Sequence, residues 1–554
     1  MLKHRWVGLW PLLVTWAAAC SSGEGTQPPL APCTATSGGQ ISLAIAAYVA
    51  IDPTQTVGCA VFPANMTAAT IEYLLVPQAA SGVVDDSSSF LLRGATVAAA
   101  APPAAAPLVA EVPGLQQRFD LSLRQAERQL ALRFPAQGRA LQAPSAARAP
   151  PQVGDVRSFH VCGDTLCATH PTVSATAKVI GRRIAVFVDN AAADTLATAD
   201  LNGLAALVDT LLYPADTAAF GRESDVDGNG LVLVLMSPKI NALTPKTVCP
   251  VYIAGLFYGG DLLLGFPGGN NAEIFYSIVP DPTGATSCAH GTDAVKHIVP
   301  VTFIHEFQHM ISWGHHVTHG NGIPEDLWLN EGLSHYAEEL GARLFVPQDT
   351  ISFCYFIFGD VHNSAQYLAN PESYFLVDST GIGGLANRGA YWLFVRFLVD
   401  QFSADTFTAS NDAFTRRLQD PIHTGAANVM QATGASFASL VGRWALANYV
   451  SDLPGFNAPS TLQYVKWRFR SDYPTIHNAC ALVGSNFPST YPLAPGSGDG
   501  SALSLAGTLR SGSGSYYLGQ QPVGPAGFTL LFSTGTGTAL RTSLVPRLNV
   551  IRIH

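Results

Sequence analysis

Charged side chains are scarce in this chain. Lys, Arg, Asp and Glu make up 12% of its 554 residues, and 39 acidic residues outnumber 30 basic ones, which gives a formal net charge of -9. The basic residues form no run or stripe able to neutralise the phosphates of a nucleic acid. We therefore expect no nucleic-acid partner.

The N-terminus also lacks a long apolar run: it reads MLKHRWVGLWPLLVTWAAACSSGEG. The apolar stretch from Trp6 to about Trp16 is shorter than the roughly 20 residues that a membrane-spanning helix needs. Basic residues before it and small residues after it are typical of an export signal over residues 1–20. Either Cys20 becomes the lipidated first residue of a lipoprotein, or a peptidase cleaves after an A-x-A site. We expect an exported protein: a cell-envelope lipoprotein of the outer membrane, anchored only by its N-terminal lipid, or a secreted protein.

The chain has nine cysteines, and assigning Cys20 to the lipid leaves an even number. Eight cysteines suit an oxidising compartment, where they can form disulfide bonds. Pairing of neighbours along the chain keeps each bridge within one structural unit, and it predicts Cys33–Cys59 and Cys162–Cys167 above all. The other cysteines, for which several connectivities stay open, are Cys249, Cys288, Cys354 and Cys480.

Composition divides the chain into segments. After a polar tether over residues 21–37, short apolar runs broken by Gly, Pro, Asp and Asn predict a small β domain over residues 38–98. Residues 99–151 form an Ala/Pro-rich linker that contains one amphipathic helix, residues 115–134. That helix is either a spacer or a pro-segment that lies on the folded protein until it is cleaved.

The larger part of the chain mixes both kinds of secondary structure. Residues 152–480 alternate strand-like runs such as RIAVFVD and LVLVLMS with helical ones, which predicts an α+β body. Beyond it, Gly, Ser and Thr separate short apolar runs such as FTLLFS, which predicts a small C-terminal β domain over residues 481–554. The expected fold class is α+β, with small β domains flanking the main body.

The scarce ionisable residues gather in residues 302–339, which carry six His and six acidic residues. His305-Glu306-Phe307-Gln308-His309 is an H-E-x-x-H pattern, and on a helix residues four apart share one face, so both imidazoles can bind one zinc ion. Glu306 stands beside the metal, where it can take a proton from a metal-activated water. Because the flanking residues are largely apolar, these groups would be costly to bury without partners or a metal.

A hydrolytic zinc site takes a third protein ligand, and Glu331 in WLNEGLSHYAEE is the candidate. The run from Trp328 to Gly332, followed by Tyr336 and Glu338, resembles the third-ligand helix of gluzincin metallopeptidases. With HEFQHMISW and an acidic loop before it, the chain is most similar to the hyicolysin-like family of secreted bacterial neutral metallopeptidases.

This resemblance implies a thermolysin-like zincin core. It also implies that His305, His309 and Glu331 bind zinc, and that Glu306 is the general base and later the proton donor to the leaving amine. A rival pattern is that of the metzincins, in which His315 would be the third ligand. The glycine that this pattern requires is displaced to Gly314, which disfavours it.

An acidic loop precedes the zinc motif. Asp225, Asp227 and Asn229 form D-x-D-x-N-G, which offers oxygen ligands on alternate residues as calcium loops do. Met236 stands where an EF-hand would have its bidentate Glu, so other carboxylates would have to complete a calcium site. The alternative is an Asp/Gly-rich β-turn before a strand.

Two further elements of a peptidase site have candidates. Residues 270–279 read as a strand, interpreted either as the edge strand that pairs with an extended substrate or as a core strand. Donors to an oxyanion could be Tyr391, His335 or Tyr336, and the role stays unassigned.

Together these features predict a monomeric zinc endopeptidase that acts on extracellular proteins or peptides, with Ca²⁺ as a second metal. The alternatives are a metzincin-type peptidase, and a catalytically silent surface protein of binding or adhesion type that the metal only stabilises. An intact Glu306 argues against the silent protein.

Overall fold

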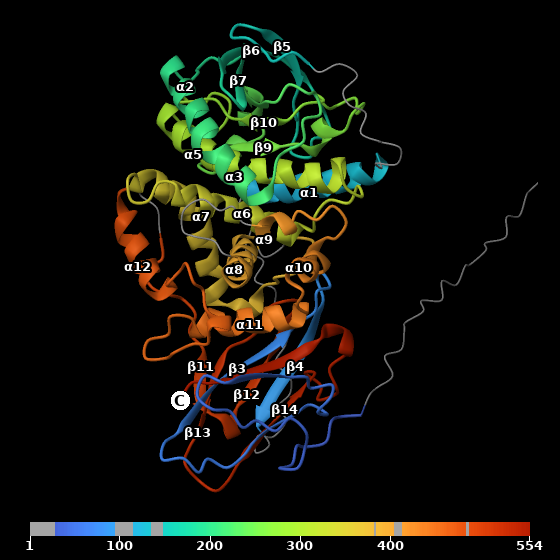
Figure 1. Ribbon diagram of the computed structural model, residues 1–554, viewed down its shortest axis with the longest axis vertical. Helices are drawn as coiled ribbons and strands as arrows, with labels where there is room; N and C mark the ends of the chain where they lie inside the picture. The colour runs from blue at the N-terminus through green and yellow to red at the C-terminus, as the bar shows by residue number, and fades with distance from the viewer. Residues whose placement is uncertain (1–27, 95–114, 135–147, 382–383, 404–412, 484–486) are drawn as a thin grey trace, which may run out of the picture.

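The computed structural model describes residues 28–94, 115–134, 148–381, 384–403, 413–483 and 487–554. The export signal, Cys20 and most of the Ala/Pro-rich linker lie outside these ranges. The chain is mixed α and β, which confirms the predicted α+β class. Figure 1 shows three layers: a mixed sheet with its helices at one end, a helical middle, and a β-sandwich at the other end.

The β-sandwich combines strands from both ends of the chain. One sheet has the order β1 (Tyr48–Ile51), β15 (Pro546–Arg552), β3 (Ile71–Ala79), β13 (Tyr517–Gln521) and β11 (Gly496–Asp499). The other has the order β12 (Ser504–Arg510), β4 (Ser87–Gly94), β14 (Phe528–Ser533) and β2 (Cys59–Phe62).

This arrangement corrects the expectation of two separate small β domains over residues 38–98 and 481–554. β3 lies between two C-terminal strands and is buried along almost its whole length. Neither segment alone has enough strands to cover such a strand on both faces, so the two segments share one core. Figure 1 shows blue and red strands side by side in the sandwich.

The mixed sheet belongs to the predicted α+β body. Its order is β5 (Val156–His160), β6 (Thr172–Ile180), β7 (Ile184–Asp189), β8 (Val232–Met236), β10 (Ile274–Ser277) and β9 (Gly255–Phe257). β7, β8 and β10 run parallel, and every residue in them is buried, as expected for strands covered on both faces. The strand predicted within residues 270–279 is therefore an interior strand, and the edge strand beside it is β9.

Helices cover this sheet and form the middle layer. α5 (Thr292–Trp313) packs on β9 and β10 and also on α6 (Leu327–Arg343), which in turn packs on α7 (Thr350–Ala369) and α8 (Leu385–Phe402). The other α-helices of the body are α2 (Thr198–Leu207), α3 (Tyr213–Phe220), α4 (Pro238–Asn241), α9 (Ala413–Arg417), α10 (Gly425–Thr433), α11 (Phe437–Val450) and α12 (Phe469–Ala479).

The helix predicted in the linker is present as α1 (Leu115–Arg133). Its apolar face is docked on the body, where Phe119, Leu123 and Ala131 are buried in the main hydrophobic core. In Figure 1, α1 lies across the boundary between the mixed-sheet layer and the helical layer. A spacer and a pro-segment could both dock in this way. Only the individual contacts of α1 can therefore distinguish the two interpretations.

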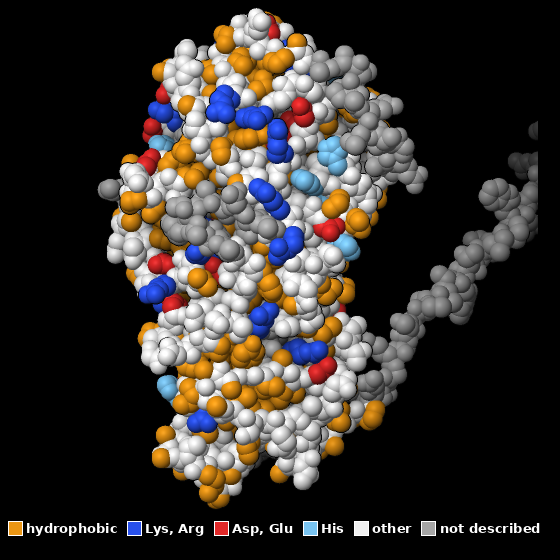
Figure 2. Space-filling model, viewed as in Figure 1, with side chains coloured by type: hydrophobic (Ala, Val, Ile, Leu, Met, Phe, Trp, Pro, Cys, Tyr) orange, Lys and Arg blue, Asp and Glu red, His pale blue; other side chains and the backbone are white. Residues whose placement is uncertain are grey.

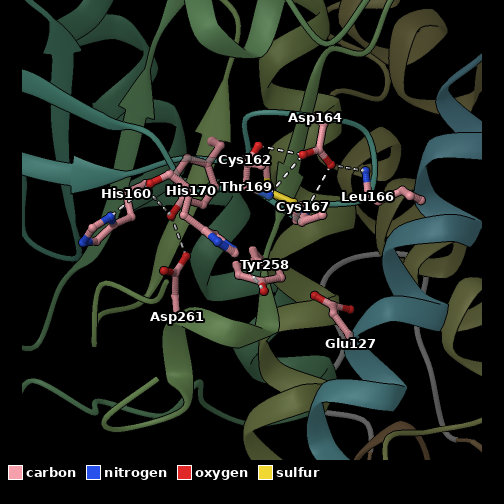
Figure 3. The surroundings of a disulfide bond; sticks show 12 residues. Glu127, His160, Cys162, Asp164, Leu166, Cys167, Thr169, His170, Tyr258 and Asp261 are labelled. Carbon is pink, nitrogen blue, oxygen red and sulfur yellow. Dashed lines mark hydrogen bonds between the residues drawn. A yellow bond between two sulfur atoms is a disulfide. The ribbon is translucent and has the colours of Figure 1, made fainter. Parts of the chain in front are cut away.

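Four disulfides join neighbouring cysteines. Cys33–Cys59 and Cys162–Cys167 are confirmed, and the remaining pairs are Cys249–Cys288 and Cys354–Cys480. Figure 3 shows Cys162–Cys167 closing a turn in which Asp164 accepts hydrogen bonds from the backbone of Leu166 and Thr169. Such bonds are compatible with an extracellular protein.

None of the helices within the described ranges combines the length and apolar character needed to cross a bilayer. On the face drawn in Figure 2, Lys and Arg side chains lie in small groups separated by uncharged surface.

Candidate metal centre

The H-E-x-x-H motif lies in the buried half of α5. Every side chain from Phe303 to Trp313 is buried, because this half of the helix is enclosed between the mixed sheet and α6. The rings of Phe303 and Phe307 pack against Phe275 and Tyr213, respectively, and fix the rotation of the helix. The opposite face carries His305, Glu306 and His309.

Helix α6 brings Glu331 to the two imidazoles. Nε2 of His305 lies 3.7 Å from Oε2 of Glu331, and Nε2 of His309 lies 3.5 Å from Oε1. Two ligands bound tetrahedrally to zinc at about 2.0–2.1 Å would be about 3.4 Å apart. All three side chains are buried, with exposed fractions of 6%, 1% and 2%. The residues predicted to bind zinc are thus brought together at a spacing that fits this metal.

Each imidazole is oriented by a partner at its other nitrogen. Oε1 of Glu338 lies 2.6 Å from Nδ1 of His305, and Oγ of Ser334 lies 3.1 Å from Nδ1 of His309 while donating to Gln308. Protons held at Nδ1 leave the Nε2 lone pairs directed at Glu331. Nε2 of His305 has no hydrogen-bond partner within the described part of the chain, which is what a ligand atom without its metal would show.

The protonation states of His309 and Glu331 also suit the binding of a cation. Burial, reinforced by nearby Arg124, lowers the pKa of His309 to about 3, so this imidazole is neutral. Burial alone would raise the pKa of Glu331, but the charge of Arg388 holds it well below its usual range. Neutral imidazoles and an ionised carboxylate are the forms that bind zinc.

Glu306 has a different environment from the ligands. Its Oε2 accepts a hydrogen bond of 2.9 Å from the backbone N–H of Phe257 in β9 and lies 3.5 Å from Nη2 of Arg124. Burial raises the pKa of Glu306 to about 7, although Arg124 opposes the rise. A carboxylate with a pKa near neutrality is suited to take up and release a proton.

Several contacts behind the site were not predicted. Nδ1 of His335 lies 3.2 Å from Glu338 and 3.1 Å from Asp360, so this oxyanion candidate is committed to carboxylates behind His305. Arg388 of α8 lies 3.2 Å from Oε2 of Glu331. The sequence signal for Glu338 was available, since it stands two helical turns after Glu331, but nothing local pointed to Asp360 or Arg388.

The other oxyanion candidates are also engaged. The hydroxyl of Tyr391 donates to Asp378, and its ring lines a small cavity beside Glu331 and Arg388. The ring of Tyr336 packs under Arg396, with 5.2 Å between the guanidinium carbon and the ring centroid. Neither contact identifies an oxyanion donor.

His315, the rival third ligand, lies beyond the end of α5 in the segment Gly314–Thr318. Its ring packs against Gly221: Nε2 lies 3.1 Å from the position that a Cβ atom on this glycine would occupy. This position faces the end of α3 and not the pair His305 and His309.

The acidic loop forms a second cluster. Carboxylates of Asp225, Asp227 and Glu273 come within 4.8 Å of one another. Asn229, which was predicted in this set, instead donates to Asp227 at 2.7 Å and accepts from the backbone of Leu231. Glu273 supplies the additional carboxylate that the loop alone lacked. Glu273 directly precedes β10, and the sequence around it did not indicate that it would contact the loop.

Beside His309 the site opens into a cavity of about 490 Å³. Its walls come from α1, α5, the start of α6 and the loop Gly82–Val84 of the sandwich. A cavity of this size next to the ligands could accept substrate side chains.

In comparisons with known proteins, no protein-family model and no curated sequence matches the chain.

Proposed function

We propose that the chain is an exported zinc-dependent endopeptidase of the gluzincin type, with a thermolysin-like core. The observation that carries this proposal is the cluster of His305, His309 and Glu331 beside the buried carboxylate of Glu306. The resemblance of the two helical motifs to those of gluzincins supports the same assignment.

A zinc ion bound by these three residues would supply a Lewis acid that activates water and polarises the scissile carbonyl. Glu306 accepts a proton as the water oxygen forms its bond to the carbonyl carbon. The same carboxyl then gives the proton to the nitrogen as the C–N bond breaks, which releases a carboxylate and an amine. One carboxyl can carry out both transfers, because the proton that it takes from the water is the one that the departing amine needs.

Two alternatives predict different behaviour. A metzincin-type enzyme would need His315 as a ligand, and the position of its ring near Gly221 argues against that role. A silent, metal-stabilised binding protein would have no use for a carboxylate beside the three ligands, so the presence of Glu306 at this position favours an enzyme.

The remaining parts of the proposal concern location and the second cluster. Export with an N-terminal lipid anchor agrees with the disulfides, and the group of Asp225, Asp227 and Glu273 would hold calcium. Protein or peptide chains are the proposed substrates.

Hydrolysis of fluorescently labelled casein tests the proposal. The assay uses the intact chain and, in parallel, chain cut on both sides of α1, because α1 forms one wall of the cavity beside the site. Removal of zinc with a chelator should abolish hydrolysis, and added zinc should restore it. Hydrolysis that survives complete zinc removal contradicts the proposal, and so does the absence of hydrolysis from both forms of the zinc-loaded chain.

A further inference from the structure

Strand β9 is the edge of the mixed sheet beside the candidate site, yet the side chains of α1 take up its backbone groups. Just before the strand, Oε1 of Gln116 accepts a bond of 3.0 Å from the N–H of Ala254, and within it the carbonyl of Phe257 accepts a bond of 2.8 Å from Nη2 of Arg124. Just beyond the strand, Oε1 of Glu127 accepts a bond of 2.6 Å from the N–H of Gly259. These groups are the ones with which an edge strand binds an extended peptide.

Charges of α1 also engage the catalytic groups themselves. Arg124 bridges Glu127, at 2.9 Å, and the proposed general base Glu306, at 3.5 Å. One turn earlier, Asp120 accepts a bond of 2.8 Å from Arg388, whose same nitrogen lies 3.2 Å from the ligand Glu331. The helix is therefore paired with the charges on both sides of the proposed metal position.

These charged residues of α1 are buried to a degree that a docked spacer would not require. Asp120 is 3% exposed and Glu127 is 1% exposed, so their partners lie in the protein and not in solvent. Figure 3 shows Glu127 directed from α1 toward the loop that carries Tyr258. Burying ion pairs carries a desolvation penalty, and burial of several on one short helix indicates a specific docking site.

With α1 in place, the residues of the proposed centre expose little surface. Glu306 is 2% exposed, and the predicted zinc ligands are at most 6% exposed. An endopeptidase has to bind an extended chain beside its metal and its base, so this arrangement describes a closed form of the site.

We propose that α1 is a built-in inhibitor that occupies the substrate groove along β9 and neutralises the general base through Arg124. This inference rests on the proposed peptidase function. Displacement or excision of α1 would free the edge of β9, Glu306 and the neighbouring cavity for substrate.

Substitutions in the intact chain test the inhibitory contacts. Asp120→Ala with Arg124→Ala removes the two charges of α1 that reach the catalytic groups, and casein hydrolysis should rise at least tenfold. Arg118→Ala with Gln129→Ala is the matched control, because both side chains are exposed on the other face of α1. The control should hydrolyse casein at the rate of the unaltered chain.

A second readout is independent of activity. Hydrogen exchange should become faster in α1 and in β9 of the Asp120→Ala/Arg124→Ala variant, while the strands of the sandwich keep their protection. Unchanged exchange in α1 together with unchanged or lower hydrolysis overturns the inference, since Arg124 would then be a structural or catalytic component of the site.

Excision separates this inference from the function on which it rests. Recognition sites for a sequence-specific protease are placed within residues 100–112 and 136–146, and a synthetic peptide of residues 115–133 is titrated back after cleavage. Hydrolysis should increase on cleavage and fall again with the peptide, and an Arg124→Ala peptide should inhibit at least tenfold less well. An intact chain as active as the cut one contradicts the inference alone, whereas two inactive, zinc-loaded forms contradict the proposed function and the inference with it.

Discussion

Nδ1 of His305 lies 2.6 Å from Oε1 of Glu338, so the first predicted zinc ligand is held by a carboxylate that is itself buried on α6. A partner of this kind fixes the ring and increases the basicity of the ligating nitrogen. Glu338→Gln should lower zinc affinity about 10–100-fold while the chain stays folded. Competition with a zinc-binding dye measures the change.

Glu325→Gln is the control for this substitution. Glu325 is similarly buried and bonds to the backbone of Gly425 and to Asn428, and none of its hydrogen bonds in the described part of the chain reaches His305, His309 or Glu331. Equal zinc affinities for Glu338→Gln and the unaltered chain would show that Glu338 does not support the site.

Glu306→Gln separates catalysis from metal binding. The amide cannot accept a proton from water, yet it leaves His305, His309 and Glu331 in place. We expect kcat on casein to fall by about 10²–10⁴ with zinc content per chain unchanged. The comparison is made on chain cut on both sides of α1, and undiminished hydrolysis by the folded variant would exclude Glu306 as the base.

The pH dependence of stability should reflect Asp261, which follows β9 and accepts bonds from the backbone of Asn270 and the hydroxyl of Tyr276. Burial raises its pKa from 3.8 to about 7, although these bonds oppose the rise. The folded state therefore holds the proton longer than the unfolded state. The stabilising contribution of Asp261 is complete below about pH 4 and is lost as the pH rises through 7.

Asp261→Asn should therefore reduce the loss of stability between pH 5 and pH 8 by about 2.5 kcal/mol. Melting temperatures at the two pH values provide the measurement. Asp293→Asn is the control, because that side chain is 88% exposed. An identical pH dependence for all three proteins would contradict the assignment.

Disulfide Cys354–Cys480 joins α7 to the end of α12 across 126 residues, whereas Cys162–Cys167 spans only 5. Because a longer loop gains more freedom when it is opened, replacing the first pair by Ala should lower the free energy of unfolding by about 5 kcal/mol, and the second by about 2 kcal/mol. Chemical denaturation compares the two variants. A larger effect of the shorter bridge would contradict the chain-entropy explanation.

Local spacing predicted the parts of the site that lie within single helices. His305 and His309 are separated by about one helical turn, Glu306 follows His305 directly, and Glu331 begins a second amphipathic pattern, so their placement follows from helix geometry once the helices form. Glu338 follows the same face of α6, although its partner could not be known before the two helices were packed.

Partners distant in sequence could not be predicted in this way. In the sandwich, Tyr73 of β3 pairs with Arg552 of β15. The pattern of residues within β3 does not specify which other strand becomes its neighbour. Likewise, β9 has only three residues, which are too few to show the alternation of apolar and polar side chains that would identify a strand at the edge of a sheet. The contact of Arg124 with Glu306 joins a helix of the predicted linker to the H-E-x-x-H motif, and it depends wholly on tertiary packing.

Zinc content of two variants tests the central claim most directly. Glu331 lies 3.5 and 3.7 Å from the two imidazoles, whereas His315 lies beside Gly221. Purified Glu331→Ala and His315→Ala chains, each shown to be folded by circular dichroism, are dialysed against trace zinc and analysed for metal per chain. The assignment predicts that Glu331→Ala loses its zinc while His315→Ala retains one equivalent at this site, because only Glu331 is one of the three protein ligands. A zinc-replete Glu331→Ala chain, or a His315→Ala chain that has lost the metal, would contradict it.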